Sequence, residues 1–177
     1  MLYKNKGLNM QNIDAQEIKE LLTIIPRDYP SLDIFHLTSL SCGLCEELDA
    51  LCKSQEYGYE LVIPDTNYFE LISKTTNFKP HKFDFNKNRY NRHAKQYDFV
   101  FVKIDLKEIE DFDIFCKKLH AVIKNAGKVI FILEEGHNLR ELEDRLIKHN
   151  YVAVNEIENT FKNYQILGAN KMHGWGN

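Results

Sequence analysis

The chain has 177 residues, of which 44% are hydrophobic and 28% charged, and its formal net charge is −3 at pH 7. This composition is typical of one folded globular domain and excludes collagen-like, low-complexity and disordered chains. A slightly acidic chain also lacks the overall charge of a nucleic-acid-binding protein. The N-terminal residues are polar and mixed, and no apolar run reaches the roughly 20 residues that cross a bilayer. We therefore expect a cytoplasmic protein without a secretory signal or membrane contact.

Apolar periodicity predicts one helix and then strands and helices in alternation. Asp14 and Glu17 have the spacing of a capping box, and the apolar residues that follow predict a helix over 14–25. Asn125-Ala126-Gly127 is expected to end the longest helix as a C-cap. Strands are expected at 33–38, 59–63, 81–85, 97–103, 128–133, 151–157 and 163–169, and further helices at 46–53, 67–75, 112–125 and 139–149.

Two strands without an outward polar face indicate the kind of sheet. Residues 97–103 (YDFVFVK) are nearly apolar on both faces, and the runs VFV and VIFIL, the latter within 128–133, lack an outward polar face, as buried strands in a parallel sheet do. The link around Asn159, between the last two strands, is too short for a parallel crossover, so those strands should be antiparallel. The pattern predicts an α/β protein with a mostly parallel sheet.

This order of elements resembles the class I methyltransferases that use S-adenosylmethionine (SAM), over roughly residues 32–170. The similarity is strongest where YDFVFVKIDLKEI and FCKKLHAVIKNAGKVIFIL stand for the family's fourth strand, the next helix and the fifth strand. Asp98 matches an acid that often begins the fourth strand, and Ala126-Gly127 stands at the family's Gly-Gly turn. The resemblance implies a Rossmann-like, mostly parallel seven-stranded sheet with helices on both faces and an antiparallel last strand.

The resemblance divides the chain into three parts. Residues 1–30 form an N-terminal helix and connector, residues 31–170 a methyltransferase-like domain, and residues 171–177 a tail that holds the single tryptophan, Trp175. A polar tail with one aromatic residue is suited to docking on its own domain or on a partner, and the sequence leaves both open.

The resemblance also implies a cofactor site after the first strand. In the family an acid and three glycines follow this strand, whereas here Ser39 stands for the acid, Ser41 for the first glycine and Cys45 for the last, and Gly43 alone is a glycine. Asp65, after the second strand, stands where the family binds the ribose hydroxyls. The implied cofactor is SAM, and the implied binding residues are Ser39, Ser41, Gly43, Asp65 and Lys103.

The altered loop motivates two further hypotheses. A non-catalytic binding or assembly module would keep the fold without its chemistry. A thiol redox protein would use Cys42 and Cys45, a C-x-x-C pair before a helix whose N-terminus stabilises a thiolate. A zinc site that adds Cys52 and a histidine is also open, although it lacks a second ligand pair of the usual spacing. The structural alternative is that the two cysteines pack in a tight turn and have no chemical role.

Possible partners follow from two surface segments. Residues 79–95 hold six lysines and arginines with aromatic residues between them, a pattern that suits weak nucleic-acid contact or a solvated loop. Ligands of parallel sheets bind beyond the carboxyl ends of the strands, so Glu134, Glu135 and the potential base His137 should share one rim with the cofactor loop. The methyl acceptor or protein partner is not identified by the sequence.

Overall fold

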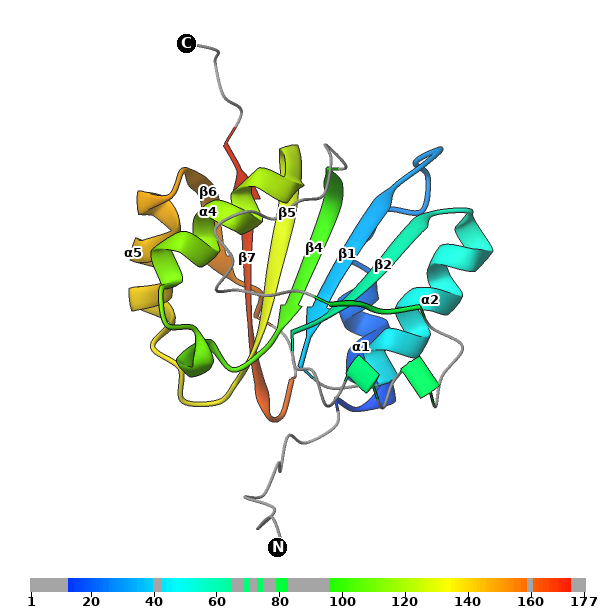
Figure 1. Ribbon diagram of the computed structural model, residues 1–177, viewed down its shortest axis with the longest axis horizontal. Helices are drawn as coiled ribbons and strands as arrows, with labels where there is room; N and C mark the ends of the chain where they lie inside the picture. The colour runs from blue at the N-terminus through cyan, green and yellow to red at the C-terminus, as the bar shows by residue number, and fades with distance from the viewer. Residues whose placement is uncertain are drawn as a thin grey trace, which may run out of the picture.

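Three apolar strands form the middle of the sheet. β1 (Asp33–Thr38) pairs in parallel with β4 (Tyr97–Lys103), and β4 pairs in parallel with β5 (Ile123–Glu134). Nearly all of β1 and β4 is buried, which explains why their apolar runs show no polar alternation. The computed structural model (Figure 1) describes residues 13–39, 43–64, 69–70, 73–74, 79–82, 96–158 and 161–172.

The outer strands complete a seven-stranded sheet in the order β3-β2-β1-β4-β5-β7-β6. On one side, β2 (Gly58–Ile63) and β3 (His81–Lys82) continue the parallel pairing. On the other side, β7 (Tyr164–Lys171) is antiparallel to both β5 and the edge strand β6 (Tyr151–Glu156). The predicted fold class, including the antiparallel final strands, is confirmed.

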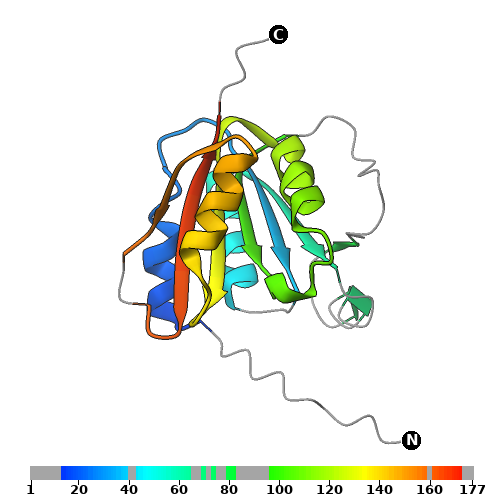
Figure 2. The same cartoon turned by 90° about the vertical axis from the view of Figure 1, so that its left-hand side faces the viewer.

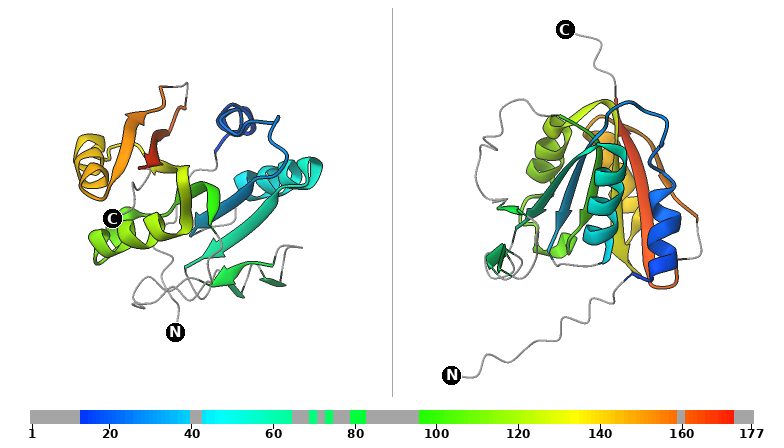
Figure 3. Two further views of the ribbon diagram at one scale, coloured as in Figure 1. Left: turned by 90° about the horizontal axis from the view of Figure 1, so that it is seen from above. Right: turned by 90° about the vertical axis from the view of Figure 1, so that its right-hand side faces the viewer.

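Helices cover both faces of the sheet and divide the core in two. Figure 3 shows α1 (Ala15–Leu22) and α2 (Gly43–Gln55) on one face, with α4 (Phe112–Val122) and α5 (Leu139–Lys148) on the other. Successive β1 residues alternate between the two cores, so Ile34 packs in the α1/α2 cluster and Phe35 in the α4/α5 cluster. A short 3-10 helix, η1 (Leu106–Glu108), follows β4.

The first helix is fastened at its N-terminus. Glu17 accepts from the Asp14 backbone N–H at 3.1 Å, which confirms the capping box, and its other oxygen accepts from the Lys162 N–H at 2.7 Å. The second bond ties α1 to the turn between β6 and β7, which lies beside this helix in Figure 2. The helix ends at Leu22, with Thr23 as its C-cap, so the predicted end at residue 25 is wrong.

The predicted end of the helix over 112–125 is also wrong. α4 ends at Val122, because Ile123 is already extended and pairs with Tyr97 of β4. The left-handed residue is Ala126, with φ 62°, and not Gly127. Gly127 is needed for another reason: a Cβ there would lie 2.7 Å from the Ile123 Cγ2 atom and 3.0 Å from the Tyr97 carbonyl oxygen. The Asn125–Gly127 segment is therefore a close approach inside a strand.

In the described part of the chain, no helix is long and apolar enough to cross a membrane.

We predict that Gly127→Ala lowers the free energy of unfolding by about 2 kcal/mol, because the new methyl group overlaps backbone atoms that cannot move away. The matched change Ala126→Gly should leave the free energy of unfolding unchanged. It removes roughly 1 kcal/mol of left-handed strain from the folded state, and the greater entropy that glycine gives the unfolded chain offsets this gain. Urea unfolding at pH 7 measures both. Equal effects of the two changes would contradict the steric explanation.

Candidate functional site

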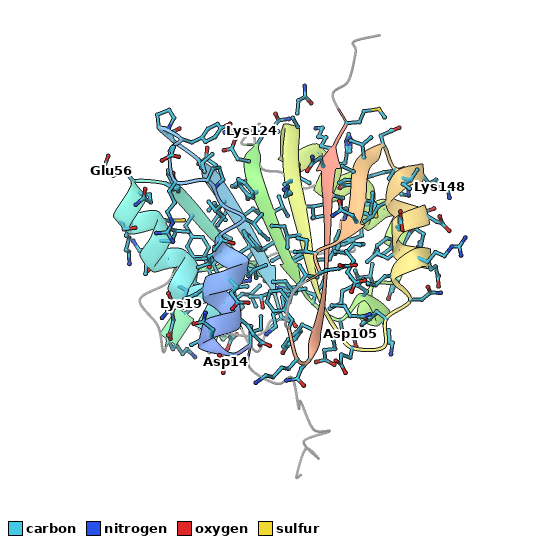
Figure 4. All side chains as sticks on the ribbon, turned by 180° about the vertical axis from the view of Figure 1, so that it is seen from behind. Asp14, Lys19, Glu56, Asp105, Lys124 and Lys148 are labelled. Atoms are coloured by element: carbon cyan, nitrogen blue, oxygen red, sulfur yellow. The ribbon has the colours of Figure 1, made fainter. Side chains whose placement is uncertain are left out.

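The candidate site lies at the carboxyl edge of the parallel strands. Thr38, the last residue of β1, is in register with Lys103, the last residue of β4, and the Ser39 N–H donates to the Lys103 carbonyl oxygen at 3.2 Å. Figure 4 places Asp105, just after β4, at the same end of the molecule as Asp14, and Lys124 at the opposite end. The strand order reverses here, because β2 lies on one side of β1 and β4 on the other.

Three of the five predicted binding residues lie in the described part of the chain, and the structure brings two of them together. Ser39 and Lys103 meet through the backbone bond above, and Gly43 is the first residue of α2. The remaining two, Ser41 and Asp65, lie outside the described residues. A Cβ on Gly43 would come within 3.2 Å of the Ile18 Cδ1 atom, so this glycine also lets α1 pack closely on the start of α2.

The Lys103 side chain is buried, with its ammonium against the start of β7. Only 1% of Lys103 is exposed, and its ammonium lies 5.4 Å from the centre of the Tyr164 ring on β7. A cation over an aromatic face is attracted by the ring, and the attraction grows when water is excluded. Sequence reasoning placed Lys103 at the strand end correctly but gave no sign of its burial.

Sequence reasoning missed His36, which is fully buried beside Lys103. The His36 Nδ1 atom is 3.1 Å from the Tyr59 hydroxyl oxygen, and the ring packs edge-on against Phe101. Its Nε2 atom is buried and has no hydrogen-bond partner among the described residues. Burial, together with the nearby Lys103 charge, lowers the His36 pKa from 6.5 to about 3. The ring is therefore neutral at physiological pH.

The polar residues at the end of β5 and just after it lie at the same rim. Glu134 and Glu135 are exposed, and the Glu135 N–H donates to the Asn163 carbonyl at 3.3 Å. The His137 backbone N–H donates to the Gln165 side-chain oxygen at 3.2 Å, which holds this segment against the start of β7. The structure thus places all three near the rim.

The described cysteines do not have the surroundings of reactive thiols. Cys45, the second member of the predicted redox pair, is completely buried, and burial raises the pKa of Cys52 and of Cys116 to about 12. Cys42 lies outside the described residues. Within the described ranges, no group of three histidine, cysteine or acidic side chains is arranged to hold a metal ion.

Of the basic segment 79–95, the structure describes residues 79–82. Its first residues include His81 and Lys82, which form β3 and are exposed. Residues 83–95 lie outside the described ranges, so nucleic-acid contact stays a prediction.

The strand order and the antiparallel β7 define the architecture of the class I SAM-dependent methyltransferases. The structure is similar to a methyltransferase from Pyrococcus furiosus, with a TM-score of 0.59, 16% identity, and coverage of 97% of this chain and 88% of that one. A SAM-dependent methyltransferase from Methanosarcina mazei gives 0.59 at 14% identity, covering 86% and 97% of the two chains.

A third similar structure contains the cofactor. It is the phosphoethanolamine N-methyltransferase 2 of Haemonchus contortus in complex with SAM, with a TM-score of 0.64 and 13% identity over 94% of this chain and 55% of that one. No protein-family model matches the sequence, and no curated protein does. At these identities the comparisons show the fold.

We predict that His36 makes the protein less stable in mild acid. Its folded-state pKa lies below the unfolded value of 6.5, so only the unfolded chain takes up a proton between pH 6.5 and about 3. The stability is complete above pH 6.5 and falls with decreasing pH, by at most about 1.4 kcal/mol per pH unit from this group.

His36→Gln should flatten this dependence, and the matched change of an exposed histidine, His81→Gln, should not. The measurement is urea unfolding at several pH values from 4 to about 7. The same slope in His36→Gln as in the unchanged protein would mean that His36 is not the group responsible.

Proposed function

We propose that the chain is a methyltransferase-like protein that binds SAM, or its product S-adenosylhomocysteine (SAH), at the carboxyl edge of β1 and β4. The observation that carries this proposal is the position of the β1–α2 connection at the point where the strand order reverses. In open α/β sheets, ligands bind in the crevice at such a point. The similarity to methyltransferase structures, one of them in complex with SAM, supports SAM as the ligand.

The residues at this edge fit an adenosyl ligand in part. The first turn of α2 begins at Gly43, and helix N-termini offer backbone N–H groups to polar ligand atoms. Asp65 supplies the carboxylate for the ribose hydroxyls in this proposal, and Ser39 takes the place of a second acid. When bound, SAM supplies an activated methyl group, so the chain has to orient an acceptor and exclude water. The acceptor is not identified.

One observation favours a second function. Gly43 is the one glycine from Ser39 to Cys45, so side chains occupy a loop where the family's backbone approaches its cofactor. A non-catalytic binding or assembly module of the same fold is therefore the alternative. The two functions differ in a single measurable property, the binding of SAM or SAH.

We predict that calorimetric titration of the purified chain detects SAH and SAM with micromolar dissociation constants. Asp65→Ala should weaken both by roughly tenfold or more, because a hydrogen bond to a charged group contributes about 1.5–3 kcal/mol. Asp144→Ala, which removes an exposed acid on α5, is the matched control and should leave both affinities unchanged.

The absence of SAM and SAH binding would overturn this proposal. If millimolar SAM and SAH produce neither heat nor a shift in melting temperature, the chain has kept the fold without the cofactor. Affinity capture with a protein partner would then become the appropriate assay for the assembly function.

A further inference from the structure

Four side chains from four strands, three of them buried and one partly buried, form a polar group on the face of the sheet covered by α1 and α2. They are His36 of β1, Tyr59 of β2, Lys103 of β4 and Tyr164 of β7, and we refer to them as the Lys103 cluster. Two contacts are present: the Tyr59 hydroxyl oxygen lies 3.1 Å from His36 Nδ1, and the Lys103 ammonium lies 5.4 Å from the centre of the Tyr164 ring. His36 and Lys103 lie on the same face of the sheet, because His36 pairs with Phe101 and Lys103 follows two residues further along β4.

The cluster carries a positive charge that no described carboxylate neutralises. Within the described ranges, no acidic side chain forms an ion pair with Lys103. The buried acid of the covering helix, Glu17, uses its two oxygens on the backbone N–H groups of Asp14 and Lys162. A buried ammonium without a counter-charge is unfavourable, because an aromatic ring replaces only part of its hydration.

The second buried lysine shows how this fold satisfies such a charge elsewhere. Lys171 of β7 donates to the His120 carbonyl oxygen at 2.8 Å and to the Ile123 carbonyl oxygen at 2.9 Å, which caps the C-terminus of α4. Lys103 has no equivalent hydrogen bonds in the described structure. The difference between the two lysines indicates a role for Lys103 other than stability.

We infer that the Lys103 ammonium binds an anionic group, a carboxylate or a phosphate, of an adenosine-type ligand at the carboxyl edge. Three observations support this place: Lys103 ends β4, it meets Ser39 through the backbone, and the strand order reverses beside it. The inference rests on the proposed function for the nucleoside part of the ligand.

We expect His36 to contribute a second group to this anion site. If the Tyr59 hydroxyl donates to Nδ1, the proton of the neutral ring lies on Nε2, which has no partner among the described residues. Nε2–H is then a donor available to the same anion. A buried polar atom without a partner is uncommon in folded proteins. His120 Nε2 is another in the described part of the chain, but it does not lie at the carboxyl edge.

The charge of Lys103 should also change the relative affinities for SAM and SAH. Both ligands carry an amino-acid carboxylate, but SAM adds a sulfonium charge, and like charges repel strongly where water is excluded. The Lys103 cluster should therefore favour SAH over SAM, by roughly tenfold.

The test compares three ligands by calorimetry: SAH with a carboxylate, adenosine monophosphate with a phosphate, and 5′-methylthioadenosine with neither. We expect an anionic ligand to bind at least roughly tenfold more tightly than 5′-methylthioadenosine, and this advantage to disappear in Lys103→Met. The preferred anion tells carboxylate from phosphate. Lys171→Met, the matched removal of a buried lysine, should keep the advantage.

Melting temperatures without ligand separate binding from stability. Lys103→Met should melt at the same or a higher temperature than the unchanged protein, because it removes a buried charge that no described carboxylate neutralises. Lys171→Met should melt lower, because it leaves two carbonyl oxygens without a donor. If the Met variant does not fold, Lys103→Gln takes its place.

The binding results test the role of Lys103 and the proposed function separately. Equal affinities of the unchanged protein for the three ligands would overturn the role of Lys103 and leave nucleoside binding intact. An anion advantage that survives in Lys103→Met would do the same. Failure of all three ligands and of SAM to bind would overturn the proposed function, and the inference with it.

Discussion

The parallel ladder between β1 and β4 is the interaction on which the rest of the structure depends. It joins two strands buried on both faces, and its register sets Thr38 beside Lys103 and His36 beside Phe101. Because β2 and β4 extend the sheet in opposite directions from β1, the same ladder creates the reversal of strand order at the carboxyl edge. The position of the candidate site is thus a product of backbone pairing, and does not depend on which side chains occupy the loop after β1.

The two ends of the sheet are built differently. At the amino end, the Asp98 carboxylate accepts from the Asp33 N–H and from the Lys124 ammonium, both at 2.7 Å, which fastens β1, β4 and β5 together. At the carboxyl end, the buried groups include a cation without a described counter-charge and the His36 Nε2 atom, which has no partner among the described residues. The difference between the ends is not complete, because His120 Nε2, near the amino end, is also buried without a partner in the described part of the chain.

Much of the fold could be predicted because its signals are local and repeated along the chain. The continuous apolar runs of β4 and β5 indicated a parallel sheet, and the short link before β7 indicated the antiparallel end. The errors have a common physical cause. The end of α4 is fixed by the pairing of Ile123 with Tyr97, a contact that no local C-cap pattern contains. His36 was missed for a similar reason: in a strand buried on both sides, apolar alternation is absent, so the sequence does not show which face a polar residue occupies.

Fold similarity alone leaves the chemistry undetermined, because stability and cofactor binding reside in different parts of this architecture. The core consists of two clusters that pack the helices on the sheet, whereas the candidate site lies at the carboxyl edge of β1 and β4. The charge of Lys103, by contrast, affects which ligands this edge favours. A cation buried at the carboxyl edge favours ligands that bring a negative charge and disfavours those that bring a positive one. If the proposed site is correct, SAM binding depends less on how many glycines remain in the loop than on how the ligand's charges balance the Lys103 cluster.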